Sequence, residues 1–248
     1  MKRQVELSEI SDGRLYTAND MVRADCRGCE GCSACCRAMG TSVVLDPLDI
    51  HRLCRGLHVS FAQLLETGVE LHVVDGLVLP NLKMTGETEA CTYLDAQGRC
   101  SIHAFRPGIC RLFPLGRYYE EDGFKYFLQI HECKKDMRGK VKVKKWLETE
   151  QIKDYESYIF KWHNFCLACE QALQTLDEEN ARILTLYILR TFYQTPYGQQ
   201  NLKEMPIDGG FYPEFEERLK ETERKLGLSA QVNRMNLGQD KKKSPGRS

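Results

Sequence analysis

The sequence predicts a mostly helical α+β chain. A small irregular cysteine-rich domain with short strands is followed by a C-terminal helical region. Three observations predict this class. Ten of the 12 cysteines lie between Cys26 and Cys133. Short apolar runs flank turn residues within the same part of the chain. Beyond residue 140, apolar residues recur at intervals of three and four, which is the helical period.

The composition is that of a globular protein. The chain has 248 residues, of which 42% are hydrophobic and 28% charged. Its 35 Lys and Arg balance 35 Asp and Glu, so there is no polycation to make nucleic acid an expected partner. No apolar run is long enough for a membrane span, and the N-terminus lacks the apolar segment of a signal peptide. We therefore expect a cytoplasmic protein with reduced thiols.

Two short helices are predicted by their first residues. Asp46 is a good N-cap, and Pro47 is favourable at the first helical position. Ser60 is expected to cap a second helix that runs through Leu65. The apolar side chains that share one face of the first helix are Ile50, Leu53, Cys54 and Leu57. Cys54 is therefore expected to be a small core residue rather than a ligand.

Two hairpins are predicted between these helices and the C-terminal region. Residues 69–83 read as two short strands around Asp75 and Gly76. A second pair is expected over residues 117–119 and 124–128, because Glu121-Asp122-Gly123 between them favours a turn.

Three helices are predicted in the second half. The first carries an apolar stripe with alternating spacings of three and four, formed by Ile152, Tyr155, Ile159, Trp162, Cys166 and Cys169. Residues 178–192 and 213–226 are the other two. Cys166 and Cys169 form a Cys-x-x-Cys pair on the stripe, and the sequence leaves open whether they are core residues or a ligand or redox pair.

The densest group of thiols lies in residues 26–36, which read C-R-G-C-E-G-C-S-A-C-C. Cys-x-x-Cys spacing lets two sulfurs approach one metal ion. In a reducing compartment such a group indicates a metal or cluster rather than disulfides, although a redox role stays open. Four of these cysteines have the C-x2-C-x2-C-x3-C spacing of a bacterial ferredoxin, but Arg37 follows where that run has proline.

The second group of thiols carries a specific resemblance. Cys91 opens C-x-x-L, Cys100 lies in G-x-C-S-I, and Cys110 lies in R-P-x-x-C-R-x-F-P. Together with Cys29-x-x-Cys32-x-x-Cys35-Cys36, this order resembles the YkgJ-type cysteine-cluster (CxxCxxCC) family, described as a zinc- or iron-chelating domain. Flagellin lysine N-methylases resemble the same domain. The resemblance covers about residues 26–135.

The resemblance implies a ligand set. The expected metal thiols are Cys29, Cys32, Cys35, Cys36, Cys91, Cys100, Cys110 and Cys133. Cys26 lies outside the minimal motif as an additional candidate. His103 stands where the family usually has tyrosine, and is either a further ligand or a partly exposed substitute for it. Because four thiolates leave a metal site negatively charged, we expect Arg106 and Arg111 to lie around the bound cofactor and offset this charge.

These expectations define a domain organisation and a function. Residues 1–25 form an N-terminal arm, 26–140 a cysteine-cluster metal-binding domain, 141–232 a helical region and 233–248 a disordered basic tail. The function is a metal-binding protein that holds zinc or an iron–sulfur cluster, with a structural, carrier or partner-docking role. The alternative is an iron–sulfur-dependent lysine N-methyltransferase acting on a flagellin-like protein, which would also use S-adenosylmethionine. A protein partner or protein substrate is expected, and no catalytic residue is identified.

Overall fold

The structure is a computed structural model that describes residues 6–27, 29, 32–135, 138–198 and 207–228. The fold is mixed α+β, with 44% helix and 21% strand, which confirms the predicted class with helix predominant. No helix in these ranges combines the length and the apolar character that crossing a bilayer requires. The predicted tail, residues 233–248, lies outside the described part, and the predicted division into four parts stays a prediction.

The strands of the described residues pair as four separate two-stranded antiparallel sheets. Two are the predicted hairpins, formed by β2 (Val69–Val74) with β3 (Leu77–Leu82) and by β6 (Leu115–Glu120) with β7 (Gly123–Leu128). A third joins the very short β4 (Met84–Thr85) and β5 (Ala90–Cys91). Gly76, with φ of 85°, supplies the left-handed residue that the β2–β3 turn requires.

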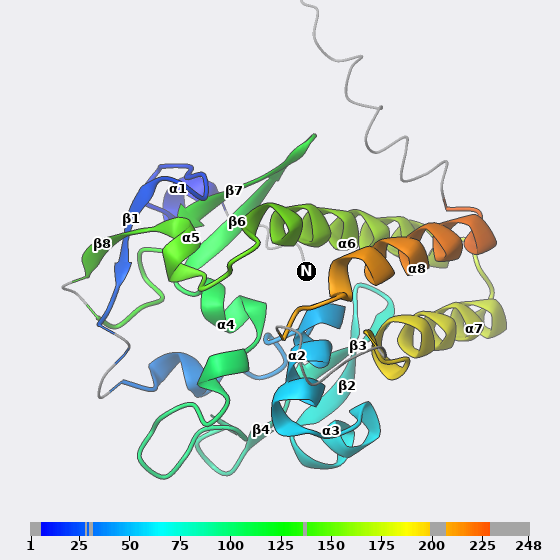
Figure 1. Ribbon diagram of the computed structural model, residues 1–248, viewed down its shortest axis with the longest axis horizontal. Helices are drawn as coiled ribbons and strands as arrows, with labels where there is room; N and C mark the ends of the chain where they lie inside the picture. The colour runs from blue at the N-terminus through cyan, green and yellow to red at the C-terminus, as the bar shows by residue number, and fades with distance from the viewer. Residues whose placement is uncertain (1–5, 28, 30–31, 136–137, 199–206, 229–248) are drawn as a thin grey trace, which may run out of the picture.

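The fourth sheet joins two distant parts of the chain. Strand β1 (Met21–Asp25) pairs with β8 (Gly139–Lys142), and isolated bridges join Ser11 to Gln129 and Tyr16 to Tyr126. The N-terminal segment also contains the short helix α1 (Leu7–Ile10). Residues 11–25 of the predicted N-terminal arm are therefore held against the chain around β7 and β8. Figure 1 shows this sheet on the left of the molecule.

The helices follow the predicted pattern closely. The predicted short helices are α2 (Pro47–Leu57) and α3 (Phe61–Thr67). The C-terminal helices are α6 (Ile152–Leu173), α7 (Glu178–Leu189), which continues as the π-helix η3 (Arg190–Gln194), and α8 (Phe211–Leu226). The remaining short elements are η1 (Ala34–Cys36), η2 (His103–Phe105), α4 (Gly108–Leu112) and α5 (Val143–Trp146). In Figure 1, α6 and α8 run alongside each other, and α7 lies beneath them.

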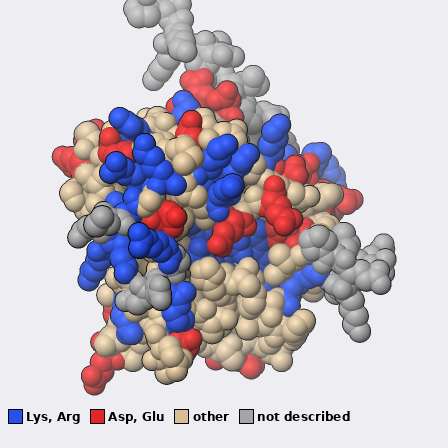
Figure 2. Space-filling view, turned by 60° about the vertical axis from the view of Figure 1, so that its left-hand side comes forward, with Lys and Arg blue, Asp and Glu red and all other residues tan. Residues whose placement is uncertain are grey.

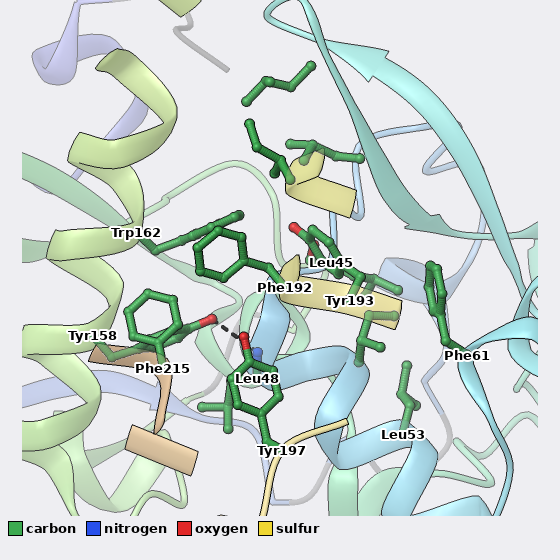
Figure 3. Packing of buried hydrophobic residues seen from close by; sticks show 14 of the residues in the cluster. Leu45, Leu48, Leu53, Phe61, Tyr158, Trp162, Phe192, Tyr193, Tyr197 and Phe215 are labelled. Carbon is green, nitrogen blue, oxygen red and sulfur yellow. Dashed lines mark hydrogen bonds between the residues drawn. The ribbon is translucent and has the colours of Figure 1, made fainter. Parts of the chain in front are cut away.

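The larger hydrophobic core joins these C-terminal helices to α2, α3 and the β2–β3 hairpin. Figure 3 shows Trp162, Phe192 and Phe215 packed together, with the leucines of α2 beside them. The hydroxyl of Tyr158 accepts the Leu48 N–H at 3.0 Å and donates to the Asp46 carboxylate at 2.9 Å. Helix α6 thus holds the N-terminus of α2 in place. Cys169 is fully buried in this core, and Cys54 and Cys166 pack against it.

Helix α2 begins with a reciprocal capping box. The Asp46 carboxylate accepts the Asp49 N–H at 2.9 Å, and the Asp49 carboxylate accepts the Asp46 N–H at 3.1 Å. Such a cap stabilises a helix by about 1 kcal/mol. Farther along the same helix, the Arg52 guanidinium forms a two-bond ion pair with Asp208, at 2.5 and 2.7 Å. This pair fixes the segment before α8 onto α2.

His51 links α2 to the same segment. Its Nε2 donates to the carbonyl of Ile207 at 2.9 Å, and the side chain is buried. Burial lowers the pKa of His51 to about 4. The positive charge of Arg55 also lowers this pKa, whereas the negative charge of Asp208 raises it. In the unfolded chain a histidine has a pKa of about 6.5. The folded protein therefore keeps His51 neutral where the unfolded chain takes up a proton.

We expect His51 to make the fold acid-sensitive. Because its folded pKa is depressed, its stabilising contribution is complete above about pH 6.5 and is lost as pH falls towards 4, by about 3 kcal/mol in all. Urea denaturation of the native protein and of His51→Gln at pH 7 and pH 4.5 measures this. The stability advantage of the native protein should shrink at pH 4.5. An advantage that is the same at both pH values would contradict the assignment.

Candidate metal centre

The cysteines come together from four parts of the chain. Cys35 and Cys36 lie on η1, Cys91 ends β5, Cys100 is bridged to Leu94, and Cys110 lies on α4. All 12 cysteines of the chain are free of disulfide bonds. The thiols needed for a metal site are therefore available.

The two cysteine-bearing segments are joined by contacts that need no metal. The Ala38 N–H donates to the Glu89 carbonyl at 2.9 Å, and Arg37 bridges to Ala90. Arg99 Nη1 donates to the carbonyl of Cys29 at 3.1 Å. These bonds bring the strand that ends in Cys91 beside the run that contains Cys35 and Cys36.

Cys110 is half-buried on α4. Burial raises the pKa of its thiol, and negative charge on Asp49, Cys91, Cys100 and Cys35 would raise it further. The pKa of Cys91 is raised in the same way, by burial and then by Cys100 and Cys35. The thiols therefore lie close enough for each to oppose ionisation of the others. A cation is the natural means of ionising such a group.

Cys35 and Cys36 form a hydrogen-bonded pair within this group. The Cys35 thiol donates to Cys36, which lowers the pKa of Cys36 and raises that of Cys35. Burial and the charges of Cys110, Cys91 and Cys100 act against the ionisation of Cys36. Both side chains are half-buried.

Cys29 and Cys26 form the other side of the group. Their sulfurs are 2.9 Å apart, and Cys26 is buried. The pKa of Cys29 is raised to about 12. Burial is the largest cause, and the hydrogen bond and charge of Cys26 and the charge of Cys35 also raise it. Cys26, which the minimal motif leaves out, thus lies next to an expected ligand. The signal in the sequence was its Cys-x-x-Cys spacing from Cys29.

Cys32 and Cys133 are the two expected ligands for which the described residues show no interaction with another thiol. Within the described residues neither thiol has a hydrogen-bond partner, and both are half-buried. The described residues also contain no three His, Cys, Asp or Glu side chains already in the arrangement of a metal site. The group is thus a gathering of thiols, and metal binding would draw selected sulfurs closer together.

Helix α4 is held in place from the core side. It begins directly after Pro107, and the Asp49 carboxylate accepts the N–H of Gly108 at 2.7 Å. Asp49 is itself buried within the capping box of α2. Burial and the neighbouring charge of Asp46 raise the pKa of Asp49 to about 7. The buried end of α2 therefore fixes the helix that presents Cys110.

The two arginines expected near the cofactor have different surroundings. Arg106 favours ionisation of Cys29, Cys35 and Cys100, because its positive charge lowers the pKa of each thiol. Arg111 is buried and donates to the carbonyls of Ala104, Arg106 and Glu148 at 2.8–3.0 Å. Arg106 thus lies beside the thiols, whereas the hydrogen bonds of Arg111 to backbone carbonyls connect the segments around α4.

His103 and the remaining cysteines show no interaction of their side chains with the grouped thiols among the described residues. His103 is exposed on η2, and burial followed by the charge of Arg106 lowers its pKa. Burial alone raises the pKa of Cys54 to about 11. Cys166 and Cys169 lie on α6, where burial raises the pKa of each.

The donor set fits zinc or an iron–sulfur cluster. Thiolates are the preferred ligands of both, and six thiols influence one another around Cys35: Cys29, Cys35, Cys36, Cys91, Cys100 and Cys110. Arg106 supplies positive charge beside them. Soft sulfur donors disfavour calcium or magnesium.

Comparison with known proteins gives one match. The family model of the CxxCxxCC domain, described as a putative zinc- or iron-chelating domain, matches residues 28–136. No curated protein and no solved structure matches the chain. The matched range contains every expected ligand thiol, whereas Cys26 lies just before it. Residues 28–136 of this chain therefore match the model of the CxxCxxCC family, which is described as a putative zinc- or iron-chelating domain.

Proposed function

We propose that this protein holds zinc or an iron–sulfur cluster through thiolates of the CxxCxxCC domain. The observation that carries the proposal is the convergence of Cys35, Cys91, Cys100 and Cys110 from separate segments, where the first three all raise the pKa of Cys110. Four thiolates complete one tetrahedral ion or one cubane cluster. Cys29, Cys32, Cys36 and Cys133 are the further ligand candidates, with Cys26 beside them.

Residues around the thiols would favour metal binding at this site. A bound metal keeps thiolates ionised and supplies either a structural link or an electron-transfer centre. Arg106 offsets the negative charge of the thiolates, and Asp49 holds the helix that carries Cys110. The proposed role is structural, carrier or partner-docking, with the helical region as the surface for a protein partner.

The test is metal analysis of protein purified without oxygen. We expect iron with acid-labile sulfide and broad absorption near about 400 nm, or stoichiometric zinc in a colourless protein. Addition of a strong chelator should destabilise the fold, because metal binding contributes folding free energy. Protein that folds stably and contains less than about one metal per ten chains would refute the proposal.

A second candidate is the iron–sulfur-dependent protein lysine N-methyltransferase. The surplus of thiols favours it, because seven sulfurs gather where four suffice for one site: Cys26, Cys29, Cys35, Cys36, Cys91, Cys100 and Cys110. Calorimetric titration with S-adenosylmethionine distinguishes the two candidates. Saturable binding supports the enzyme, and its absence in protein that carries the cluster argues for the binding role.

A further inference from the structure

A cavity of about 210 Å³ opens beside the candidate metal centre. Three separate segments line it: Asp25 and Cys29 near β1, His103 and Arg106 near η2, and residues 141–148 around α5. A water molecule occupies about 30 Å³ of liquid. The cavity therefore has room for a small organic molecule, and one of its walls is the thiol of Cys29.

Arg106 is one residue of this cavity whose side chain has an unused hydrogen-bond donor. Its side chain is 15% exposed, and among the described residues its buried Nε has no hydrogen-bond partner. Its nearest acidic partner is Glu148, at a long 3.6 Å from Nη2, and the Glu148 side chain is half exposed. A buried donor without a partner is destabilising, because its hydrogen bond to water has been lost and not replaced. An acceptor entering the cavity would remove this cost.

The wall of the cavity holds two cations, Arg106 and Lys145, and two carboxylates, Asp25 and Glu148. Of these, Lys145 is exposed, and the described residues place no carboxylate within 4 Å of its ammonium group. Arg23, Lys140 and Lys142 are exposed on the adjoining β1–β8 sheet. Figure 2, which brings this side forward, shows Lys and Arg side chains gathered over it. Such a field raises the local concentration of anions.

Of the two acidic side chains in the wall, each already has a partner. Asp25 accepts the backbone N–H of Arg27 at 2.9 Å, and Glu148 faces Arg106. The indole of Trp146 is fixed, because its Nε1 donates to the carbonyls of Leu112 and Phe113 at 3.4 and 3.2 Å. The cavity therefore combines an apolar wall with two cations that have unused donors.

We propose that this cavity binds a small organic or inorganic oxyanion, a carboxylate or a phosphate. Arg106 and Lys145 hold the anionic group, since a guanidinium fork matches the geometry of both kinds of oxyanion. The body of the ligand rests on Trp146 and points towards Cys29. This site is independent of whether zinc or iron occupies the metal centre.

Tryptophan fluorescence tests the proposal directly. The chain has two tryptophans, Trp146 in the cavity and Trp162 in the core. Metal-loaded protein is titrated at constant ionic strength with glutarate in one arm and inorganic phosphate in the other. We expect a saturable change in at least one arm, and the arm that responds identifies the class. Trp146→Phe should abolish the signal while calorimetry still detects binding.

Matched variants decide whether the site is the one proposed. Arg106→Gln should weaken binding by about tenfold or more, because it removes a charged hydrogen-bond donor. Lys145→Gln should weaken it severalfold, and Lys153→Gln, exposed on α6 away from the cavity, should leave it unchanged. Metal content is measured for each variant. If Arg106→Gln loses metal, the affinity of Lys145→Gln for the anion decides whether the anion binds in this cavity.

The proposal is overturned by either of two outcomes. One is the absence of any saturable change with both ligands in metal-loaded protein. The other is unchanged affinity in Arg106→Gln or, if that variant loses metal, in Lys145→Gln. Neither outcome bears on the metal centre, because metal content is measured separately.

Discussion

Cys110→Ser is expected to remove most of the bound metal. The charges of Cys91, Cys100 and Cys35 all act on the Cys110 thiol, which places it within the group. Serine keeps the size of the side chain but is a poor ligand for zinc or iron. If four ligands share the 10–16 kcal/mol typical of a structural zinc site, losing one weakens binding by about 3 kcal/mol, roughly a hundredfold. Metal per chain and the thermal midpoint should both fall.

Cys54→Ser is the matched control for this experiment. Cys54 is also partly buried, but burial alone raises the pKa of its thiol, with no contribution from another cysteine. The variant should lose some stability from core packing and keep its full metal content. Loss of metal in Cys54→Ser, or full metal content in Cys110→Ser, would contradict the assignment of the site.

Asp208→Ala is expected to have the largest effect on folding away from the metal centre. The Arg52 side chain is 2% exposed, and Asp208 neutralises it through two short bonds. Removing one partner of a buried pair leaves an uncompensated charge and costs about 3–5 kcal/mol. Urea denaturation should show this loss in the free energy of unfolding.

The double variant Arg52→Met/Asp208→Ala separates two contributions to this loss of stability: the unpaired buried charge and the packing of the segment before α8. Replacing both charges removes the unpaired guanidinium, so a large part of the stability should return. A double variant as unstable as Asp208→Ala would mean that packing of the segment before α8, rather than buried charge, dominates.

Local signals explain which elements could be predicted from the sequence. Asp46 and Pro47 mark the start of α2, and Asp75-Gly76 marks the turn between β2 and β3. The spacing of Tyr155, Ile159 and Trp162 identifies the buried face of α6. Each of these features depends on residues within a few positions of one another. The family resemblance likewise depends on ordered short motifs, and it is confirmed over residues 28–136.

The pairing of β1 with β8 could not be predicted, because its partners are far apart in the chain. Each strand is too short to show clear alternation, and the lysines of β8 are typical of a solvated loop. Arg111 shows the same limit at the site. A basic residue next to Cys110 suggests charge compensation, but the directions of three backbone carbonyls determine its role. Those directions arise only from the fold.

The β1–β8 sheet also makes the cysteine-bearing segment a closed ring of chain. Met21 faces Lys142, so backbone pairing fastens together the two ends of a stretch of roughly 120 residues. Closing a flexible stretch of that length costs about 4 kcal/mol of chain entropy by the logarithmic rule. The sheet offsets this loss of chain entropy. Thiols from the two ends of the ring can therefore converge on one metal site at a smaller entropic penalty.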